Sequence, residues 1–386
     1  MVLLLKNGEV YAPEYLGKQD VLVVGNTIEV IAPAIDLSHE YVKILDCSDK
    51  ILVPGFIDGH VHLVGGGECP SCLRIPESQC SDFISGGVTT VLGLLGTDGI
   101  TKSLESLYTK CKCLENEGMS AYMLTGAYQI PSPTLTGSVM RDVLLIDKVL
   151  GVKSAISDHR SSAPQVTDLA KLCAEARVGG LLSNKAGLCV MHLGSGKDTL
   201  KPILEMLEST DIPRKNILPT HVGRTPQLFH DAIQYAKSGG HIDLTASEKE
   251  SDICTAHQVH IALEEGVSSE MLTISSDAYG SRPIFDEEGK LIHISYMNSQ
   301  VLYENFMSMI IEEKIPMEVA LKFVSSNVAA RMGLETQKGH LKAGYDADII
   351  VMNPDLSIRD VLCKGREMMR NQELCSGYYR GPSGPL

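Results

Sequence analysis

The chain has 386 residues and a mass of 41.8 kDa, with 44% hydrophobic and 21% charged residues. This composition is typical of a folded protein and excludes collagen-like, disordered and low-complexity chains. The 34 Lys+Arg against 48 Asp+Glu give a formal net charge of −14, and such a surface repels phosphate backbones and anionic lipid headgroups. We therefore expect no nucleic-acid partner and no membrane partner.

The cysteines and the chain start indicate the compartment. Eleven cysteines are spread along the chain, and an odd number cannot pair completely. This usage favours a reducing compartment. A secretory signal has a basic region before its apolar run, and the short apolar start of this chain, residues 1–6, has none. We therefore expect a cytoplasmic location.

Residues 1–52 and 336–380 share a pattern of short apolar strands separated by turn residues such as Asn7-Gly8. The expected strands are Val2–Lys6, Val21–Val24, Thr27–Ile31, Val42–Leu45, Ala347–Met352 and Ile358–Cys363. Fragments from both ends of a chain can complete one sheet. We therefore predict one small β-sandwich domain built from both chain ends, followed by a flexible tail at 381–386.

Residues 53–335 alternate apolar strand runs with amphipathic helical stretches. Eight predicted strands end near His62, Leu95, Gly126, Ser157, His192, His221, Thr245 and Asp277. The helical segments between them include Thr101–Glu117, Pro164–Arg177 and Thr225–Ser238. The alternation predicts an α/β fold, a (β/α)8 TIM-like barrel, and catalytic residues in such barrels lie at the carboxyl ends of the strands.

Metal-ligand residue types follow this rule. His60 and His62 end the first barrel strand, and side chains two apart on a strand point to the same side. Both can reach one metal ion, although two buried, hydrogen-bonded histidines are an equal alternative. His192, His221 and Asp277 end the fifth, sixth and eighth strands. Their convergence at one barrel mouth favours a metal site.

Lys153 lies in the apolar fourth strand. An ammonium beside two divalent cations would be repelled, so a lysine aimed into this site must lose its proton or be modified. Carboxylation by CO2 would turn it into an anionic carbamate, N6-carboxylysine, which can bridge two metals. The alternative is a lysine that extends to solvent. With the histidines present, we favour the bridge.

These residues carry a family resemblance over nearly the whole chain. The run Pro54–His62, the strand-four lysine, the single histidines of strands five and six and the strand-eight aspartate resemble the binuclear amidohydrolase superfamily. Within it, the chain is most similar to the isoaspartyl dipeptidase (β-aspartyl peptidase) family. The segments that carry this likeness are Gly65–Glu68, Leu124–Tyr128, Gly151–Lys153, Ser157–Ser161, Thr220–Arg224 and Gly344–Ile349.

The resemblance implies a zinc-dependent hydrolase that cleaves β-aspartyl (isoaspartyl) dipeptides. It implies that His60 and His62 hold one zinc ion, that His192 and His221 hold the other, that carboxylated Lys153 bridges the two, and that Asp277 completes the first. A metal-bridging hydroxide would attack the amide, with Asp277 as general base and then acid. Tyr128 would donate a hydrogen bond to the oxyanion. The family also suggests a homo-oligomer, an octamer.

Charge matching extends the hypothesis to the substrate. A β-aspartyl dipeptide carries one ammonium and two carboxylates. Glu68 matches the ammonium, Arg160 and Arg224 can grip the carboxylates with both guanidinium nitrogens, and Ser281 can add a hydrogen bond. Each of these residues alone would be an ordinary surface group. Their positions next to predicted metal ligands favour substrate binding.

Two departures from the family pattern affect the substrate loops. The Gly65–Glu68 loop is one glycine shorter than expected and continues into Cys69 and Cys72, while Ala278-Tyr279 replaces a smaller, glycine-led turn. Both can shift specificity. We interpret the Cys69-x-x-Cys72 pair as ordinary loop cysteines, because a structural zinc site needs a second pair with suitable spacing.

Two other functions remain open. A cyclic amide hydrolase, similar to dihydroorotase or hydantoinase, would use the same metal ligands. A non-catalytic barrel that serves as an assembly scaffold would be expected to have lost some of those ligands, yet all six positions hold competent residues. Two arginines and Glu68 favour a linear, zwitterionic substrate.

Overall fold

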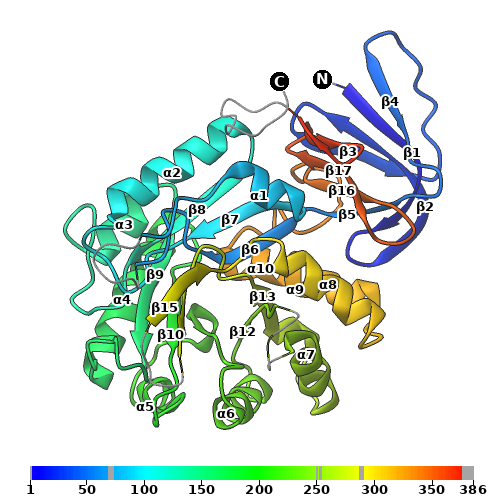
Figure 1. Cartoon of the computed structure of the whole chain (residues 1–386). Coiled ribbons are helices and arrows are strands. Elements are labelled where there is room, and N and C mark those ends of the chain that lie inside the picture. Colours follow the sequence, from blue (N-terminus) through cyan, green and yellow to red (C-terminus); the bar gives the residue numbers. More distant parts are fainter. Residues whose placement is uncertain (1, 68–73, 249–250, 252–253, 287–290, 376–386) are drawn as a thin grey trace.

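The computed structural model describes residues 2–67, 74–248, 251, 254–286 and 291–375. It consists of a barrel and a separate β-sheet formed by both chain ends (Figure 1). The predicted fold class, a (β/α)8 barrel with a small β domain from the two ends, is confirmed. The tail predicted at 381–386 lies outside the described residues.

The barrel is a sheet of eight parallel strands in chain order. The strands are β6 (Phe56–Val61), β7 (Val88–Gly93), β8 (Ser120–Gly126), β9 (Val149–Ile156), β10 (Leu188–Leu193), β11 (Ile217–Thr220), β12 (Ile242–Thr245) and β13 (Leu272–Ser275). The backbone N–H of His62 donates to the carbonyl oxygen of Ala278 at 2.9 Å. This bond joins the end of the first strand to the chain just after the eighth.

Helices surround the barrel and follow the predicted amphipathic stretches. They are α1 (Cys80–Ser85), α2 (Leu104–Glu117), α3 (Val139–Leu145), α4 (Val166–Ser183), α5 (Lys201–Ser209), α6 (Pro226–Lys237), α7 (Thr255–Glu264), α8 (Val301–Ile311), α9 (Met317–Val324) and α10 (Ser326–Met332), with 3-10 turns at Arg214–Asn216 and Ser269–Met271. Side chains cap the starts of α2, α3 and α6; Ser103, for example, accepts from the backbone of Ser106 at 3.2 Å. Among the described helices, none combines the length and apolar character that a membrane crossing requires.

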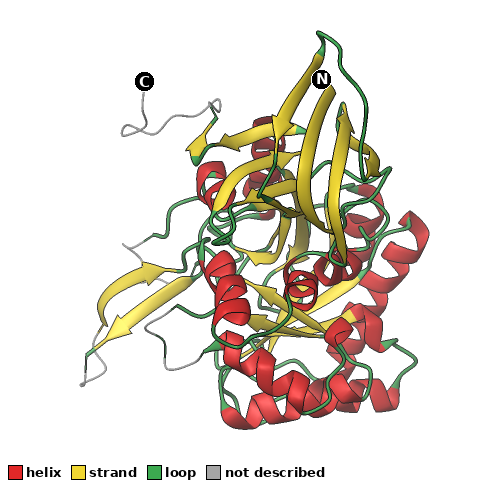
Figure 2. Ribbon diagram, turned by 90° about the vertical axis from the view of Figure 1, so that its right-hand side faces the viewer, coloured by secondary structure: helices red, strands yellow, loops and turns green. Residues whose placement is uncertain are grey.

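The second sheet has nine strands. They are β1 (Val2–Tyr11), β2 (Tyr15–Val24), β3 (Thr27–Ala32), β4 (Val42–Asp46), β5 (Ile51–Pro54), β16 (Ile349–Met352), β17 (Ile358–Cys363), β18 (Arg366–Arg370) and β19 (Glu373–Leu374). The antiparallel pair β5 and β16 connects the N-terminal strands to the C-terminal ones. A further antiparallel hairpin, β14 (Ser281–Phe285) and β15 (Leu291–Tyr296), projects from the body of the protein (Figure 2).

The turn predicted at Asn7-Gly8 is wrong, because β1 continues through these residues as a bulged strand. Asn7 has a φ of 65°, and its N–H donates to Oδ1 of Asp20 at 2.8 Å. Before the bulge β1 pairs with β4, and after it with β5. The bulge therefore lets one strand change partners within the sheet.

The barrel interior is apolar where the strands start. Ile57, Leu150, Leu188 and Leu218 lie at the first or second positions of their strands and pack with Val328 and other residues of α10. The polar residues discussed below lie at the strand ends. The apolar packing therefore fixes the strands from one side and leaves the other end free for chemistry.

A buried ion pair supports the connection between the barrel and the β domain. Nζ of Lys338 lies 2.7 Å from a carboxylate oxygen of both Asp346 and Asp348, and the side chain of Lys338 is 1% exposed. Burial alone would lower the pKa of Lys338, but the two carboxylates raise it above its usual value. The carbonyl of Asp348 also accepts from Gly55, which precedes β6.

Replacing Lys338 by methionine should leave two carboxylates without their cation. We expect the free energy of unfolding, measured by chemical denaturation, to fall by about 3–5 kcal/mol. The matched control is Lys342→Met at an exposed position. Equal stability of the two variants would contradict the structural role of Lys338.

Candidate functional site

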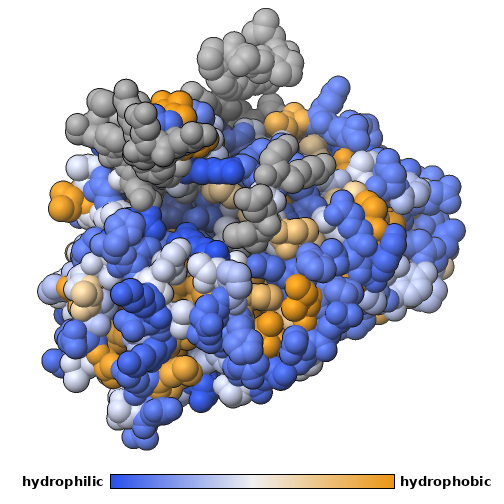
Figure 3. Space-filling model, turned by 60° about the horizontal axis from the view of Figure 1, so that its bottom comes forward, coloured by the Kyte–Doolittle hydropathy of each residue, from blue (hydrophilic) through white to orange (hydrophobic). Residues whose placement is uncertain are grey.

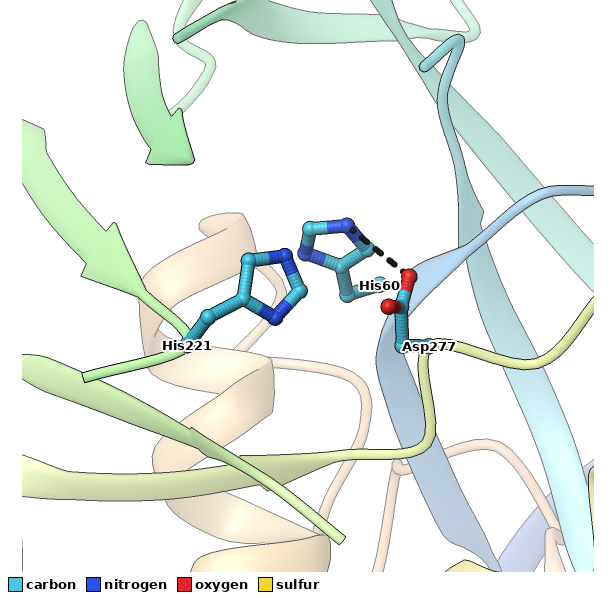
Figure 4. Close-up of side chains that lie close together, drawn as sticks. All are labelled: His60, His221 and Asp277. Atoms are coloured by element: carbon cyan, nitrogen blue, oxygen red, sulfur yellow. Dashed lines mark ion pairs between the residues drawn. The ribbon is translucent and has the colours of Figure 1, made fainter. Parts of the chain in front are cut away.

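Five polar side chains gather at the carboxyl ends of the barrel strands. His60 lies on β6 with His62 directly after it, His192 lies on β10, His221 follows β11, and Asp277 lies two residues after β13. Each of these histidines is at most 6% exposed. Figure 4 shows that the side chains of His60, His221 and Asp277 point toward one another. The structure thus brings together the residues that the strand-end pattern selected.

The distances between these side chains are short. Oδ1 of Asp277 lies 3.1 Å from Nε2 of His62 and 3.5 Å from Nε2 of His60. His60, His221 and Asp277 each offer one possible ligand atom, and these three atoms lie within 4.8 Å of one another. The ring of His192 continues the row, with its centroid 4.6 Å from that of His221. Groups this close can share bound cations.

The state of the imidazoles suits metal binding. Burial lowers the pKa of His60, His192 and His221 well below the usual value, so they are neutral, the form that binds metal. The Nδ1 atoms of His60 and His62 are buried and have no hydrogen-bond partner among the described residues. Buried polar atoms are normally paired. Imidazole nitrogens with a carboxylate form a donor set that fits zinc.

Lys153 lies in β9, a strand in which every residue is buried. Its side chain is fully buried, and its Nζ lies 3.1 Å from Nε2 of His60. This position excludes the alternative of a lysine that extends to solvent. Burial lowers the pKa of Lys153 to about 7. Much of the amine is therefore uncharged near neutral pH, the form that can react with CO2.

Contacts with the backbone hold the first and eighth strands together. Oδ1 of Asp58, on β6, accepts from the backbone of Ser276 at 3.1 Å and of His60 at 3.3 Å. The hydroxyl of Ser276 donates to the other oxygen. Asp277 itself has a φ of 53°, an uncommon conformation for a non-glycine residue that often marks functional sites. Asp58 therefore fixes the distance between His60 and Asp277.

His221 is held in a similar way. Its φ is 63°, and its Nδ1 lies 2.6 Å from the hydroxyl oxygen of Thr245 at the end of β12. Sequence reasoning missed both Asp58 and Thr245. The available signals were that Asp58 lies within the histidine run and that Thr245 ends the predicted seventh strand.

Three further predicted residues surround His192. The hydroxyl oxygen of Tyr128 lies 2.7 Å from Nδ1 of His192. The same hydroxyl lies 3.3 Å from Nε2. Nη2 of Arg160 and Nη1 of Arg224 lie 3.3 and 3.1 Å from Nε2 as well. Asp158, a residue that sequence reasoning missed, bonds both Arg160 and His192. The sequence feature that could have identified Asp158 was its place in the segment 157–161, which resembles the family.

A cavity of about 330 Å³ opens beside this cluster. Its walls include His221, Arg224, Asp277 and Ser281, and its outer part carries an ion pair between Arg282 and Glu248. The space-filling view shows a hollow bordered largely by hydrophilic side chains (Figure 3). Predicted metal ligands and predicted substrate ligands thus line one cavity.

Of the other predicted positions, some lie outside the described residues and one lies within them. Glu68, Cys69 and Cys72 lie outside the described residues. His159 is a loop residue with its side chain 86% exposed.

The Ala278-Tyr279 departure has a structural explanation. Ala278 is fully buried, and the hydroxyl of Tyr279 donates to Asp82 on α1. The ring of Tyr279 stacks on Tyr296 of the hairpin, with centroids 5.1 Å apart and planes inclined by 14°. The tyrosine therefore anchors the turn after β13 between α1 and the hairpin.

Comparisons with known proteins place this geometry in a family. A model of the amidohydrolase family matches residues 295–362. A dihydroorotase of Lactobacillus johnsonii is 23% identical over 394 residues, which are 92% of this chain and 89% of that protein. The D-hydantoinase of Thermus sp. is 15% identical, with a TM-score of 0.69 over 97% of this chain and 96% of that one. Likenesses at these identities show the fold alone.

A stronger match comes from Fervidobacterium islandicum AW-1. Its β-aspartyl dipeptidase, solved in complex with the dipeptide β-Asp-Leu, is 39% identical, with a TM-score of 0.92 over 98% of this chain and 100% of that chain. A second structure of that enzyme gives 37% identity and a TM-score of 0.91. The predicted resemblance is thereby confirmed, and the chain belongs to the β-aspartyl dipeptidase family of the amidohydrolase superfamily.

Proposed function

We propose that this protein is a zinc-dependent dipeptidase that hydrolyses β-aspartyl dipeptides. The observation that carries the proposal is the cluster of four buried histidines, buried Lys153 and partly buried Asp277 beside a cavity that Arg224 lines. The family membership and the β-Asp-Leu complex of the Fervidobacterium enzyme support it. The cytoplasmic location and the octamer suggested by the sequence stay predictions.

The donor set fits two metal ions. In our proposal His60, His62 and Asp277 would hold one zinc ion and His192 and His221 the second, and Lys153, once carboxylated by CO2, would be a ligand that the two share. When bound, such cations act as Lewis acids and make water a nucleophile at neutral pH. Carboxylation turns the Lys153 amine into an anion, which offsets part of the positive charge.

Asp277 is suited to move a proton. Burial alone would raise its pKa, but the adjacent His62 and His60 lower it below the usual range. An ionised carboxylate can accept a proton from the attacking water. The same group can then donate this proton to the leaving amine, so that the peptide bond breaks without a free amide anion.

Tyr128 is suited to donate a hydrogen bond. Burial raises its pKa above the usual value, so the phenol keeps its proton. Its hydroxyl reaches the row of imidazoles, where it lies 2.7 Å from Nδ1 of His192. We propose that this hydroxyl donates to the oxygen of the scissile carbonyl as negative charge develops there.

Substrate recognition falls to the charged groups near the cavity. We propose that Arg160 and Arg224 bind the two carboxylates of the dipeptide, that Glu68 binds its ammonium group, and that Ser281 adds a hydrogen bond. Ser281 lies at the start of β14 and lines the cavity with Arg224. A guanidinium can hold a carboxylate through two parallel hydrogen bonds. This arrangement favours a linear, zwitterionic substrate over a cyclic amide.

The substrate assignment is tested by turnover. Purified protein loaded with zinc should release leucine from β-Asp-Leu with a kcat/KM on the order of 10²-fold higher than from α-Asp-Leu, because the charges are placed for the β linkage. Dihydroorotate serves as the cyclic comparison. Activity on dihydroorotate alone would replace our proposal by the cyclic amide hydrolase, and no turnover of any of the three would favour the scaffold.

The lysine bridge is tested by removing it. Lys153→Ala should bind less than two zinc ions per chain and lose activity, because the bridging anion is gone; propionate should restore part of both. Zinc content is measured by atomic emission, with Lys197→Ala at an exposed position as the control. A Lys153→Ala variant with full metal content and activity would exclude the bridge.

The proton transfer is tested at Asp277. Asp277→Asn keeps the size of the side chain but cannot shuttle a proton, so kcat for β-Asp-Leu should fall by about 10²–10⁴-fold. Asp211→Asn, at an exposed position, is the matched control. If Asp277→Asn kept the turnover of the control, another group would have to act as the base.

A further inference from the structure

The carboxylate of Asp158 is buried between the ends of β9 and β10. Its side chain is 2% exposed. Oδ1 accepts from the backbone N–H of Arg160 at 2.8 Å and from Nε of Arg160 at 2.9 Å. Oδ2 accepts from Nη2 of Arg160 at 2.6 Å and lies 2.9 Å from Nε2 of His192. One carboxylate thus contacts both a predicted substrate ligand and a predicted metal ligand.

Two glycines make this contact possible. Gly194 follows β10, and a Cβ there would lie 2.4 Å from Oδ2 of Asp158. A Cβ on Gly196 would lie 2.3 Å from the carbonyl oxygen of Ser157, which accepts from the N–H of Gly196 at 2.8 Å. Ser157 has a φ of 50°, and its hydroxyl donates to the carbonyl of Thr199 at 2.7 Å. The turn after β9 therefore packs closely against the loop after β10.

The contact with Asp158 influences the tautomer of the His192 ring. Oδ2 of Asp158 lies 2.9 Å from Nε2, closer than the guanidinium nitrogens at 3.1 and 3.3 Å, so it favours the tautomer with the proton on Nε2 and the lone pair on Nδ1. Nδ1 is the ring nitrogen nearer to Tyr128, whose hydroxyl oxygen lies 2.7 Å from Nδ1 and 3.3 Å from Nε2. Partners of this kind orient metal-binding histidines and make them better ligands.

Electrostatics support the same role. The guanidinium groups of Arg160 and Arg224 both approach the His192 ring within 3.3 Å. The carboxylate of Asp158 accepts from Nε and Nη2 of Arg160. Its negative charge offsets the positive charge of the arginines beside the imidazole.

We propose that Asp158 is a positioning residue that couples the substrate-binding Arg160 to the metal-holding His192. The proposal rests on the proposed function for the roles of these two residues. Asp158 touches neither substrate nor metal in this account. Both of its oxygens fix the guanidinium of Arg160, and Oδ2 also contacts the ring of His192, so that the two binding sites share one anchor.

Asp158→Asn separates this role from simple structural support. The carboxylate contacts Arg160 and His192 with two acceptor oxygens, whereas an amide has one acceptor oxygen and one NH2 group, so the variant must turn a donor toward part of this set. We expect the zinc dissociation constant, measured by competition with a chromophoric chelator, to rise about 10–100-fold. At saturating zinc, KM for β-Asp-Leu should rise on the order of tenfold, with a smaller change in kcat.

The control is Asp360→Asn in the distant sheet. Asp360 is also buried, and it is bonded to Arg359 in a similar way, with its Oδ2 2.7 Å from Nε of the arginine. If Asp158 were only structural, both variants would lose thermal stability and neither would change zinc affinity or KM. That result for Asp158→Asn would overturn the proposal.

A measurement on the unmodified protein covers the case in which the variant does not fold. In a crystal structure of the zinc-loaded wild type, Nε2 of His192 should stay within hydrogen-bond distance of Asp158 and the metal should lie on Nδ1. Metal on Nε2 would contradict the proposal. If the wild type did not cleave β-Asp-Leu, the proposed function would fail, whereas zinc affinity and this geometry would still test the role of Asp158.

Discussion

The burial of the Lys153 amine against His60 is the contact on which the rest of the site depends. A charged ammonium would be costly in a strand without solvent contact, and burial accordingly lowers the pKa of Lys153 to about 7. The neutral imidazole of His60 lies against the amine, and Asp277 supplies a negative charge nearby. This barrel end therefore favours bound cations and a modified lysine over a free ammonium.

The fold positions these groups by separating packing from chemistry. Apolar residues at the strand starts pack against α10, while the strand ends carry the polar groups. Buried carboxylates then tie neighbouring ends together. Asp58 joins the first strand to the turn before Asp277, and Asp158 joins the fourth strand end to His192. In the proposed enzyme, the carboxylates at the strand ends thus fix the geometry that the metal ions and the dipeptide require.

Sequence periodicity predicted the barrel and the residues at its strand ends, because both depend on local patterns. It did not predict contacts between residues that are distant in sequence. Asp58 and Ser276 are 218 positions apart, and Tyr279 and Asp82 are 197 apart. The bulge at Asn7 was also missed, because Asn-Gly is a common turn signal and only the pairing of β1 with two partners reveals the continuous strand. Tertiary packing, which has no local signature, decides these features.

The central claim is that two metal ions and a carboxylated lysine occupy the barrel end. The most direct test is a crystallographic map of active protein, purified with bicarbonate, with anomalous data at the zinc edge. The account predicts two anomalous peaks between the histidines and continuous density for a carbamate on Lys153. An unmodified amine with no anomalous peak beside it, in protein that cleaves β-Asp-Leu, would contradict it.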